Sequence, residues 1–392
     1  MSSIPSELSP PARLLLGPGP SPTSPEVLRA LGKPTVGHLD PFFLGIMDEV
    51  RSMLRTVFGT QNELTFPMSG TGSAGMETCL VNLIEPGTRV LVGINGVFGV
   101  RMAEVARRAG AEVQVAKVLW GLPMSAEALL EAAGGQSFDL LCVVHAETST
   151  GALSEIPPLR AVADQLGALL VLDCVTSIGG PTLELDAWGV DAAYAGTQKC
   201  LSCPPGLAPV SFSPRAQERL AKRKRAVQSW YLDLSLIANY WGAERAYHHT
   251  APINMLYGLH EALRQVLLEG LPARALRHRL HASAFRAGCT ALGLSMVVEG
   301  AGRLDPLTSV HCPEDVQEAQ LRSFLLKEHN IEIGGGLGPM AGKIWRIGLM
   351  GSGSSRDNVE RCILAMAEAL SDQGFGSKGD ALQAVAEVYA KA

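Results

Sequence analysis

Short apolar runs alternate with amphipathic stretches over the first half of the chain. Seven runs are apolar at nearly every position, and they span residues 64–68, 89–92, 113–116, 140–144, 169–172, 192–195 and 209–212. Helical periodicity separates them, at 73–84, 97–109, 125–134 and 157–166. Alternating strands and helices predict βαβ units and a mostly parallel sheet. Strands without polar positions predict helices on both faces of that sheet.

The second half of the chain reads as mainly helical. Helices are predicted there at 214–224, 233–241, 254–269, 272–292, 314–328, 355–370 and 380–391, with strands at 331–333 and 344–349 and apolar runs at 294–298 and 308–311. One further helix is predicted in the first half, at 41–59. The late mixture of strands and helices predicts a smaller α/β unit. We therefore expect a flexible N-terminal arm over 1–12, a large domain over 13–274 and a small C-terminal domain over 275–392.

Composition and charge exclude several classes of protein. The 392 residues are 47% apolar and 18% charged, which is enough for a sizeable core. A net charge of −5 gives no basic field, so we expect no nucleic-acid partner. The basic cluster at 222–225 reads as a solvated face near a helix end. No apolar run reaches the roughly 18 residues of a membrane helix, and the N-terminal residues lack the basic and apolar regions of a signal peptide, so we expect a cytoplasmic protein without a membrane partner.

The eight cysteines do not form a metal-binding pattern. Most of them lie inside apolar runs, where a thiol packs as a small hydrophobe. Cys200 and Cys203 make one C-x-x-C pair, whereas a zinc ribbon needs a second pair. His248 and His249 are adjacent, and adjacent side chains are expected to diverge, so packing is favoured over ligation. We expect no metal site.

A glycine-rich turn follows the first predicted strand. Residues 69–75 read SGTGSAG and lead into a helix, which is typical of an anion cradle built from backbone N–H groups and a helix N-terminus. The same letters match G-x-G-x-x-G, the dinucleotide pattern. That interpretation requires an acidic residue about 20 residues further on, and the next strand ends in Gly93-Ile94-Asn95. Binding of some anion is therefore favoured over a nicotinamide cofactor.

Chemically active side chains follow three more strands. The segment 145–151 reads HAETSTG, Asp173 ends the next run, and Lys199 follows the run after that. Each has a structural explanation when taken alone: His145 as a core hydrogen bond, Asp173 as a helix cap, Lys199 as an ion pair. Together with the cradle they are the parts that pyridoxal phosphate needs. A lysine makes the Schiff base, a carboxylate pairs with the pyridine nitrogen, and Phe98 offers a stacking ring.

The chain resembles the class V (fold type I) aminotransferases, and within them the alanine–glyoxylate and serine–pyruvate group. The resemblance covers about residues 14–348. The motifs that carry it are LLLGPGP at 14–20, GHLDP at 37–41, SGTG at 69–72, HAETSTG at 145–151, GTQK at 196–199, YHHT at 247–250, and GGLGP at 335–339 before Arg346. It implies an α/β fold with a seven-stranded, mostly parallel sheet and a smaller C-terminal α/β domain.

The resemblance also implies roles for individual residues. Lys199 is the expected Schiff-base lysine and proton shuttle, and Asp173 is the expected partner of the pyridine nitrogen. The expected cofactor-binding residues are Thr71, Gly72, Ser73 and Gln198 at the phosphate, Thr148 at the ring hydroxyl, Val175 and Phe98 on the two ring faces, and Asp173, Lys199, Tyr247 and Thr250. The expected substrate-binding residues are Arg346, Gly37, His38 and Thr148. Of these, Arg346 would bind the substrate carboxylate through its guanidinium fork.

The expected activity is a ping-pong transamination between small substrates. Alanine or serine would donate the amino group, and glyoxylate or pyruvate would accept it. In the family, the residues that match Tyr247 and Thr250 cross to the neighbouring subunit, so a homodimer is implied. Another class V transaminase, using ureidoglycine or 2-aminoethylphosphonate as donor, is the alternative. A cysteine desulfurase would need a mobile cysteine, and a nicotinamide dehydrogenase is supported only by the glycine pattern.

Overall fold

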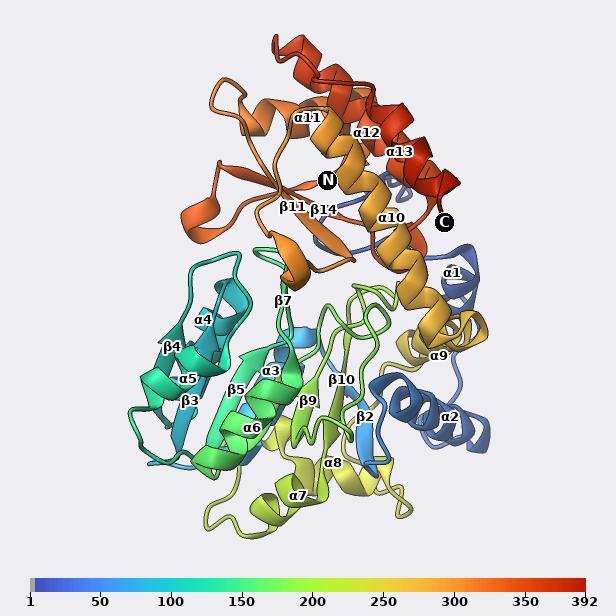
Figure 1. Cartoon of the computed structure of the whole chain (residues 1–392). Coiled ribbons are helices and arrows are strands. Elements are labelled where there is room, and N and C mark those ends of the chain that lie inside the picture. The colour runs from blue at the N-terminus through green and yellow to red at the C-terminus, as the bar shows by residue number, and fades with distance from the viewer. Residues whose placement is uncertain (1–3) are drawn as a thin grey trace.

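A seven-stranded sheet forms the centre of the larger unit in this computed structural model, which describes residues 4–392 (Figure 1). All seven predicted runs are strands of this one sheet. Their order across the sheet is β2 (Leu64–Ser69), β10 (Leu207–Phe212), β9 (Ala192–Tyr194), β8 (Leu169–Asp173), β5 (Leu140–Val144), β3 (Arg89–Ile94) and β4 (Glu112–Lys117). Strand β10 runs antiparallel to β2 and β9, and all other neighbouring pairs in the sheet are parallel. The prediction of a mostly parallel sheet is confirmed.

Helices occupy the stretches where helical periodicity was predicted, with ends that differ by a few residues. The helices of this unit are α1 (Pro25–Leu31), α2 (Pro41–Phe58), α3 (Gly72–Leu83), α4 (Val97–Arg108), α5 (Ala126–Ala133), α6 (Ile156–Leu166), α7 (Pro214–Ala221), α8 (Leu234–Trp241) and α9 (Ile253–Glu269). Local signals explain several of these ends. Asp40 caps α2 by accepting a hydrogen bond from the Phe42 N–H, and Gly59 ends it with φ of +64°.

A second unit contains most of the C-terminal part of the chain and lies above the large sheet in Figure 1. Its sheet has the order β11 (Leu307–His311), β14 (Ile344–Gly348) and β13 (Gly334–Gly335). Its helices are α10 (Leu271–Ala291), α11 (Glu318–Glu328), α12 (Arg356–Asp372) and α13 (Ala381–Ala390). These elements surround a core of their own, which includes the fully buried Trp345.

The N-terminal strand joins this second unit. Strand β1 (Leu14–Leu15) pairs in parallel with β12 (Ile331–Glu332), and Leu16 is buried in the smaller core. Residues 14–16 thus pack beside a segment more than 300 residues away in the sequence. The domain boundaries stay a prediction, but these residues, which we assigned to the large domain, contribute to the small core.

The remaining sequence predictions have mixed outcomes. Residues 4–12 are exposed and form neither helix nor strand, so the flexible arm stays a prediction, and residues 1–3 lie outside the described residues. Within the basic cluster, Arg223 donates hydrogen bonds to the carbonyl groups of Val81, Asn82 and Ile84, where α3 ends. Its charge therefore complements the dipole of α3. In residues 4–392 no helix has the length and apolarity to cross a bilayer. The cytoplasmic location stays a prediction.

Candidate active site

The carboxylate expected to face the cofactor is buried and fixed by two hydrogen bonds. Asp173 is the last residue of β8 and is 3% exposed. Its Oδ1 accepts from the Val175 N–H at 2.8 Å, and its Oδ2 accepts from the Tyr194 hydroxyl at 2.7 Å. Burial raises the pKa of Asp173 to about 6, although both hydrogen bonds favour the ionised form. The carboxylate is held in one orientation before any ligand arrives.

The candidate catalytic amine lies beneath the N-terminal turn. Lys199 is 8% exposed, and its Nζ donates to the Pro18 carbonyl oxygen. Burial lowers the pKa of Lys199 to about 8, and the charge of Arg346 lowers it further, against the opposing effect of Asp173. A neutral amine is therefore accessible near physiological pH, as a nucleophile and a base require.

Glycine at position 19 makes room for this amine. A Cβ at Gly19 would lie 2.5 Å from Lys199 Nζ and 2.6 Å from Lys199 Cδ. The backbone there has φ of +107°, a conformation that residues with a side chain rarely adopt. The turn and the lysine therefore fit only because residue 19 has no side chain.

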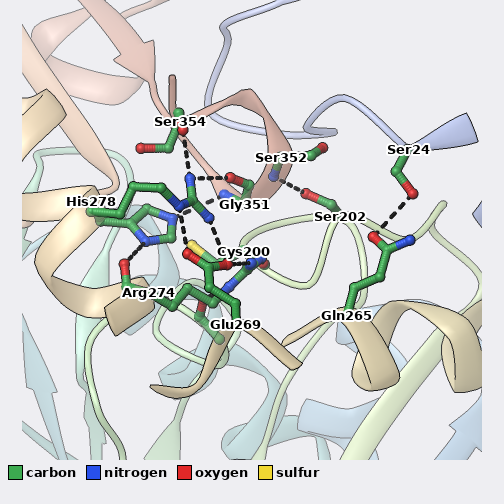
Figure 2. Close-up of polar contacts among 12 residues, drawn as sticks. Ser24, Cys200, Ser202, Gln265, Glu269, Arg274, His278, Gly351, Ser352 and Ser354 are labelled. Carbon is green, nitrogen blue, oxygen red and sulfur yellow. Dashed lines mark hydrogen bonds and ion pairs between the residues drawn. The ribbon is translucent and has the colours of Figure 1, made fainter. Parts of the chain in front are cut away.

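The backbone after Lys199 is held by residues from distant elements. The Ser21 hydroxyl donates to the Lys199 carbonyl at 2.6 Å. Arg274, on α10, donates to the Cys200 carbonyl at 2.6 Å and to the Gly179 carbonyl at 2.8 Å. Figure 2 shows Arg274 beside Cys200 and Glu269, whose carboxylate pairs with it at 2.5 Å. The lysine is thus positioned by α10 as well as by the sheet.

A second contact joins this loop to the segment after β14. The Ser352 N–H donates to the Ser202 hydroxyl at 2.8 Å (Figure 2). Beside it, the Gly351 N–H donates to His278 Nε2 at 3.0 Å. The smaller unit therefore contacts the loop after Lys199 through the backbone N–H of Ser352, while the Gly351 bond stays within the smaller unit.

Small residues line the turn that was predicted to bind an anion. A Cβ at Gly72 would lie 3.3 Å from Val175, and a Cβ at Gly196 would lie 2.8 Å from Gln198 Oε1. Thr71 caps α3 without a side-chain hydrogen bond, and both Thr71 and Ser73 are exposed. The buried Gln198 Oε1 has no hydrogen-bond partner in residues 4–392. These residues leave an open helix N-terminus next to Val175, as an anion cradle requires.

Two residues of the polar segment 145–151 bind the N-terminus of a helix. Glu147, 0% exposed, accepts hydrogen bonds from the Phe98 N–H at 3.1 Å and from the Ser149 hydroxyl at 2.6 Å. The Val97 N–H donates to the Ser149 hydroxyl. Glu147 and Ser149 therefore cap α4 and hold the backbone of Phe98. The Phe98 ring is half-buried, with the Arg101 guanidinium 5.1 Å from its centroid.

The candidate substrate arginine reaches the same segment. Arg346 is on β14, is 6% exposed, and donates to the Gly335 carbonyl at 2.7 Å and to the Thr148 carbonyl at 3.1 Å. Burial lowers the pKa of Arg346 to about 10, while Glu147 opposes this change. The guanidinium stays charged at neutral pH, close to Lys199 and Thr148, where a substrate carboxylate would complete its hydrogen bonding.

The residues predicted to serve a neighbouring subunit form a separate group. Tyr247 is 61% exposed, with its ring centroid 5.0 Å from that of His38 and its hydroxyl 3.4 Å from Thr250 Oγ1. Gly37 is exposed beside His38. No contact described for residues 4–392 joins these four residues to Asp173 or Lys199.

The adjacent histidines do not diverge, which corrects our expectation. Their Nδ1 atoms are 2.8 Å apart, and His249 Nε2 is 2.7 Å from the Ser69 hydroxyl. The Trp230 ring stacks on His248 at 4.2 Å, so packing turns the two imidazoles toward each other. His249 thereby connects the loop of Tyr247 to the start of the glycine-rich turn.

The other candidates behave as packing residues. His145 contacts Trp188 edge to face at 5.3 Å, and among the described residues its buried Nδ1 has no hydrogen-bond partner. Burial raises the pKa of the Cys200 and Cys203 thiols to about 12. Neither thiol has the exposure or the acidity that a desulfurase nucleophile needs.

Sequence reasoning missed three residues that hold the site together. Tyr194 was counted as part of an apolar strand, although a tyrosine in a fully buried run needs a partner for its hydroxyl and could have been singled out. Gly19 lies in the motif at 14–20 and Ser21 directly follows it in the same turn, and neither was given a role. Nothing local in the sequence indicated that this turn lies over Lys199.

The comparisons with known proteins agree with this geometry. The model of the Aminotransferase class-V family matches residues 15–345. The crystal structure of alanine–glyoxylate aminotransferase from Nostoc sp. aligns with a TM-score of 0.92 and 47% identity, over 94% of this chain and 98% of that one. Ureidoglycine–glyoxylate aminotransferase from Bacillus subtilis gives a TM-score of 0.96 and 39% identity, over 98% and 100%. Alanine–glyoxylate aminotransferase of Drosophila melanogaster is 38% identical over 94% of this chain and 95% of its own.

The fold and the arrangement of lysine, carboxylate and glycine-rich turn define an aminotransferase of fold type I. The chain belongs to the class V aminotransferase family. The predicted fold class and enzyme class are confirmed.

Proposed function

We propose that this enzyme transfers the amino group of alanine or serine to glyoxylate or pyruvate, with pyridoxal phosphate as cofactor. One observation carries the proposal: a buried lysine of lowered pKa lies within range of the charges of a fixed carboxylate, Asp173, and a buried arginine, Arg346, and an open helix N-terminus adjoins Val175 and Gly196. This arrangement can hold an aldehyde cofactor, its phosphate and an amino-acid carboxylate together.

The residues present fit the proposed cofactor. A Cβ at Gly72 or Gly196 would narrow the turn, and the unpaired Gln198 Oε1 and open Thr71 hydroxyl leave polar groups for a phosphate and its surroundings. Asp173 offers a fixed carboxylate for the ring nitrogen. When bound, the cofactor would draw electrons from the substrate Cα–H bond. The ring contacts expected of Phe98, Val175 and Thr148 are part of this proposal.

Lys199 and Arg346 do the protein's part of the chemistry. With its pKa near 8, the Lys199 amine can accept the proton from the substrate Cα and donate it to the cofactor. Proton transfer by a positioned group increases the rate by roughly 10²–10⁴. Arg346 orients the substrate by binding its carboxylate through two parallel hydrogen bonds. Its contacts with Gly335 and Thr148 fix the guanidinium before the substrate arrives.

The donor has a second candidate. The Bacillus subtilis protein named (S)-ureidoglycine–glyoxylate transaminase is 38% identical over 98% of this chain, the same identity as the alanine–glyoxylate enzyme of Drosophila melanogaster, whereas that of Nostoc sp. is 47% identical. Glyoxylate is the acceptor in both names, which supports it as the acceptor here. Ureidoglycine is therefore kept as the alternative donor.

We further infer a homodimer in which Tyr247 and Thr250 complete the partner's site. Large side chains are exposed near this loop: Tyr247 and Trp230 are each 61% exposed, and Phe42 is 64% exposed. Exposed aromatic side chains of this size favour a covering subunit. Gly37 and His38, beside Tyr247, would then line the substrate side of the interface.

The absorption spectrum of the purified protein tests this function. The enzyme loaded with pyridoxal phosphate should show a yellow band that fades with L-alanine and returns with glyoxylate. If the band fades with (S)-ureidoglycine and not with alanine or serine, ureidoglycine is the amino donor and our proposed donor is wrong. A protein that stays colourless with added pyridoxal phosphate would overturn the cofactor and the proposed function together.

A further inference from the structure

A fully buried tyrosine contacts the carboxylate of the site. Tyr194 is the last residue of β9, is 0% exposed, and lies opposite Asp173 in the parallel pairing of β8 and β9. Side chains opposite each other in a parallel pair extend from the same face of the sheet. The hydroxyl accordingly reaches Asp173 Oδ2 at 2.7 Å, the distance of a strong O–H···O hydrogen bond.

The glycine-rich turn makes room for this tyrosine. A Cβ at Gly75 would lie 3.1 Å from the Cβ atoms of Tyr194 and Ala208. Gly75, the third glycine of the pattern at 70, 72 and 75, thus lets α3 approach β9 and β10, the strands that carry Tyr194 and Ala208. The last glycine of the G-x-G-x-x-G pattern therefore serves helix–strand packing.

The hydrogen bond acts on the charge of the carboxylate. Asp173 accepts one bond on each oxygen, and both bonds favour ionisation, whereas burial and the charge of Glu147 favour the neutral acid. Burial and the nearby Asp173 raise the pKa of the Tyr194 phenol, so it remains a donor. Without the phenol, Asp173 would keep one fixed oxygen and lose a bond that stabilises its ionised form and its orientation.

We propose that Tyr194 is a positioning residue that keeps Asp173 ionised and aimed at the pyridine nitrogen, and so sets the affinity of the apoenzyme for pyridoxal phosphate. The inference rests on the proposed function, since it requires that cofactor. Because Tyr194 acts through Asp173, it should affect affinity only for a cofactor whose ring has a pyridine nitrogen that the Asp173 carboxylate can bind.

The experiment measures cofactor affinity in the wild type and in Tyr194→Phe. Dissociation constants of the full-length apoprotein are determined for pyridoxal phosphate and for an analogue that has carbon in place of the pyridine nitrogen. Loss of one hydrogen bond to a buried charge predicts about 10- to 100-fold weaker binding of pyridoxal phosphate. The analogue should bind both proteins within about threefold, because it offers Asp173 no partner.

The pH dependence gives a second signature. Since the variant raises the pKa of Asp173, its deficit relative to wild type should be larger at pH 6 than at pH 8. Tyr257→Phe is the matched control: Tyr257 is 7% exposed, and its buried hydroxyl has no hydrogen-bond partner in residues 4–392. This control should bind pyridoxal phosphate as the wild type does.

Each alternative outcome is decisive. Unchanged affinity for pyridoxal phosphate in Tyr194→Phe overturns the inference, as does an equal loss for cofactor and analogue, which would indicate general loosening of the site. Wild-type protein that binds no pyridoxal phosphate overturns the proposed function instead. If Tyr194→Phe does not fold, 4-aminophenylalanine and 4-methylphenylalanine at position 194 fill the same space with and without a donor. Only the amino form should then retain affinity.

Discussion

Replacing Gly19 by alanine should displace the catalytic amine while leaving the fold intact. The new Cβ would lie 2.5 Å from Lys199 Nζ, so the amine must move by about 1 Å to reach ordinary van der Waals distance. The end of a lysine side chain moves at little cost, whereas the φ of +107° strains any residue with a Cβ by about 1–3 kcal/mol. A misplacement of about 1 Å at reacting atoms lowers rates by about 10²-fold.

The assay compares kcat for L-alanine and glyoxylate with the urea-derived free energy of unfolding. Gly87→Ala is the matched control, because Gly87 has φ of +86° and open space around its Cβ position. Both variants should lose about 1–3 kcal/mol of stability. Only Gly19→Ala should lose about 10² in kcat.

The reasoning is refuted if Gly19→Ala keeps the kcat of Gly87→Ala. It is also refuted if its loss of activity is explained by a larger unfolded fraction at the assay temperature. Either result would mean that Lys199 adjusts to a methyl group without leaving its working position.

Three further predictions follow from the site. Lys199→Ala should abolish transamination and still bind pyridoxal phosphate reversibly, and a variant with wild-type turnover would contradict the assignment. In stopped-flow measurements, the rate at which the apoprotein binds the cofactor should increase with pH, with the midpoint of the transition near pH 8. Arg346→Gln should move that midpoint to higher pH, because the arginine charge lowers the pKa of Lys199. Arg274→Lys removes the guanidinium hydrogen bonds to the carbonyl groups of Gly179 and Cys200 and should lower the free energy of unfolding, measured with urea, by about 2–3 kcal/mol. An unchanged free energy of unfolding would mean that these two hydrogen bonds do not stabilise the fold.

The elements of this fold were predictable because burial leaves a local pattern. A strand covered on both faces reads as a continuous apolar run, and all seven such runs are strands of one sheet. The candidate catalytic pair was predictable for a related reason. An acid or an amine at the end of a buried strand, or a few residues beyond it, stands out against its neighbours, and Asp173 and Lys199 both do so.

The roles of neighbouring polar residues were not predictable. In the segment 145–151, Glu147 and Ser149 look as available for chemistry as Thr148 does. The structure uses both to cap α4, because the N-terminus of that helix lies against them. Which polar side chains remain free for a ligand depends on the helix ends nearby, which a strand-end pattern does not contain.

By itself, the sequence determined the succession of strands and helices and the side chains that end the strands, since both depend on residues close together in the chain. Only the tertiary structure decided the order of the strands, with β10 inserted antiparallel between β2 and β9. The tertiary structure alone placed Gly19 next to the Lys199 side chain. It also brought the Tyr194 hydroxyl within hydrogen-bond distance of Asp173. These contacts join segments that are distant in the chain. They form only when the layers pack against each other, and burial then favours structures in which most polar groups are paired.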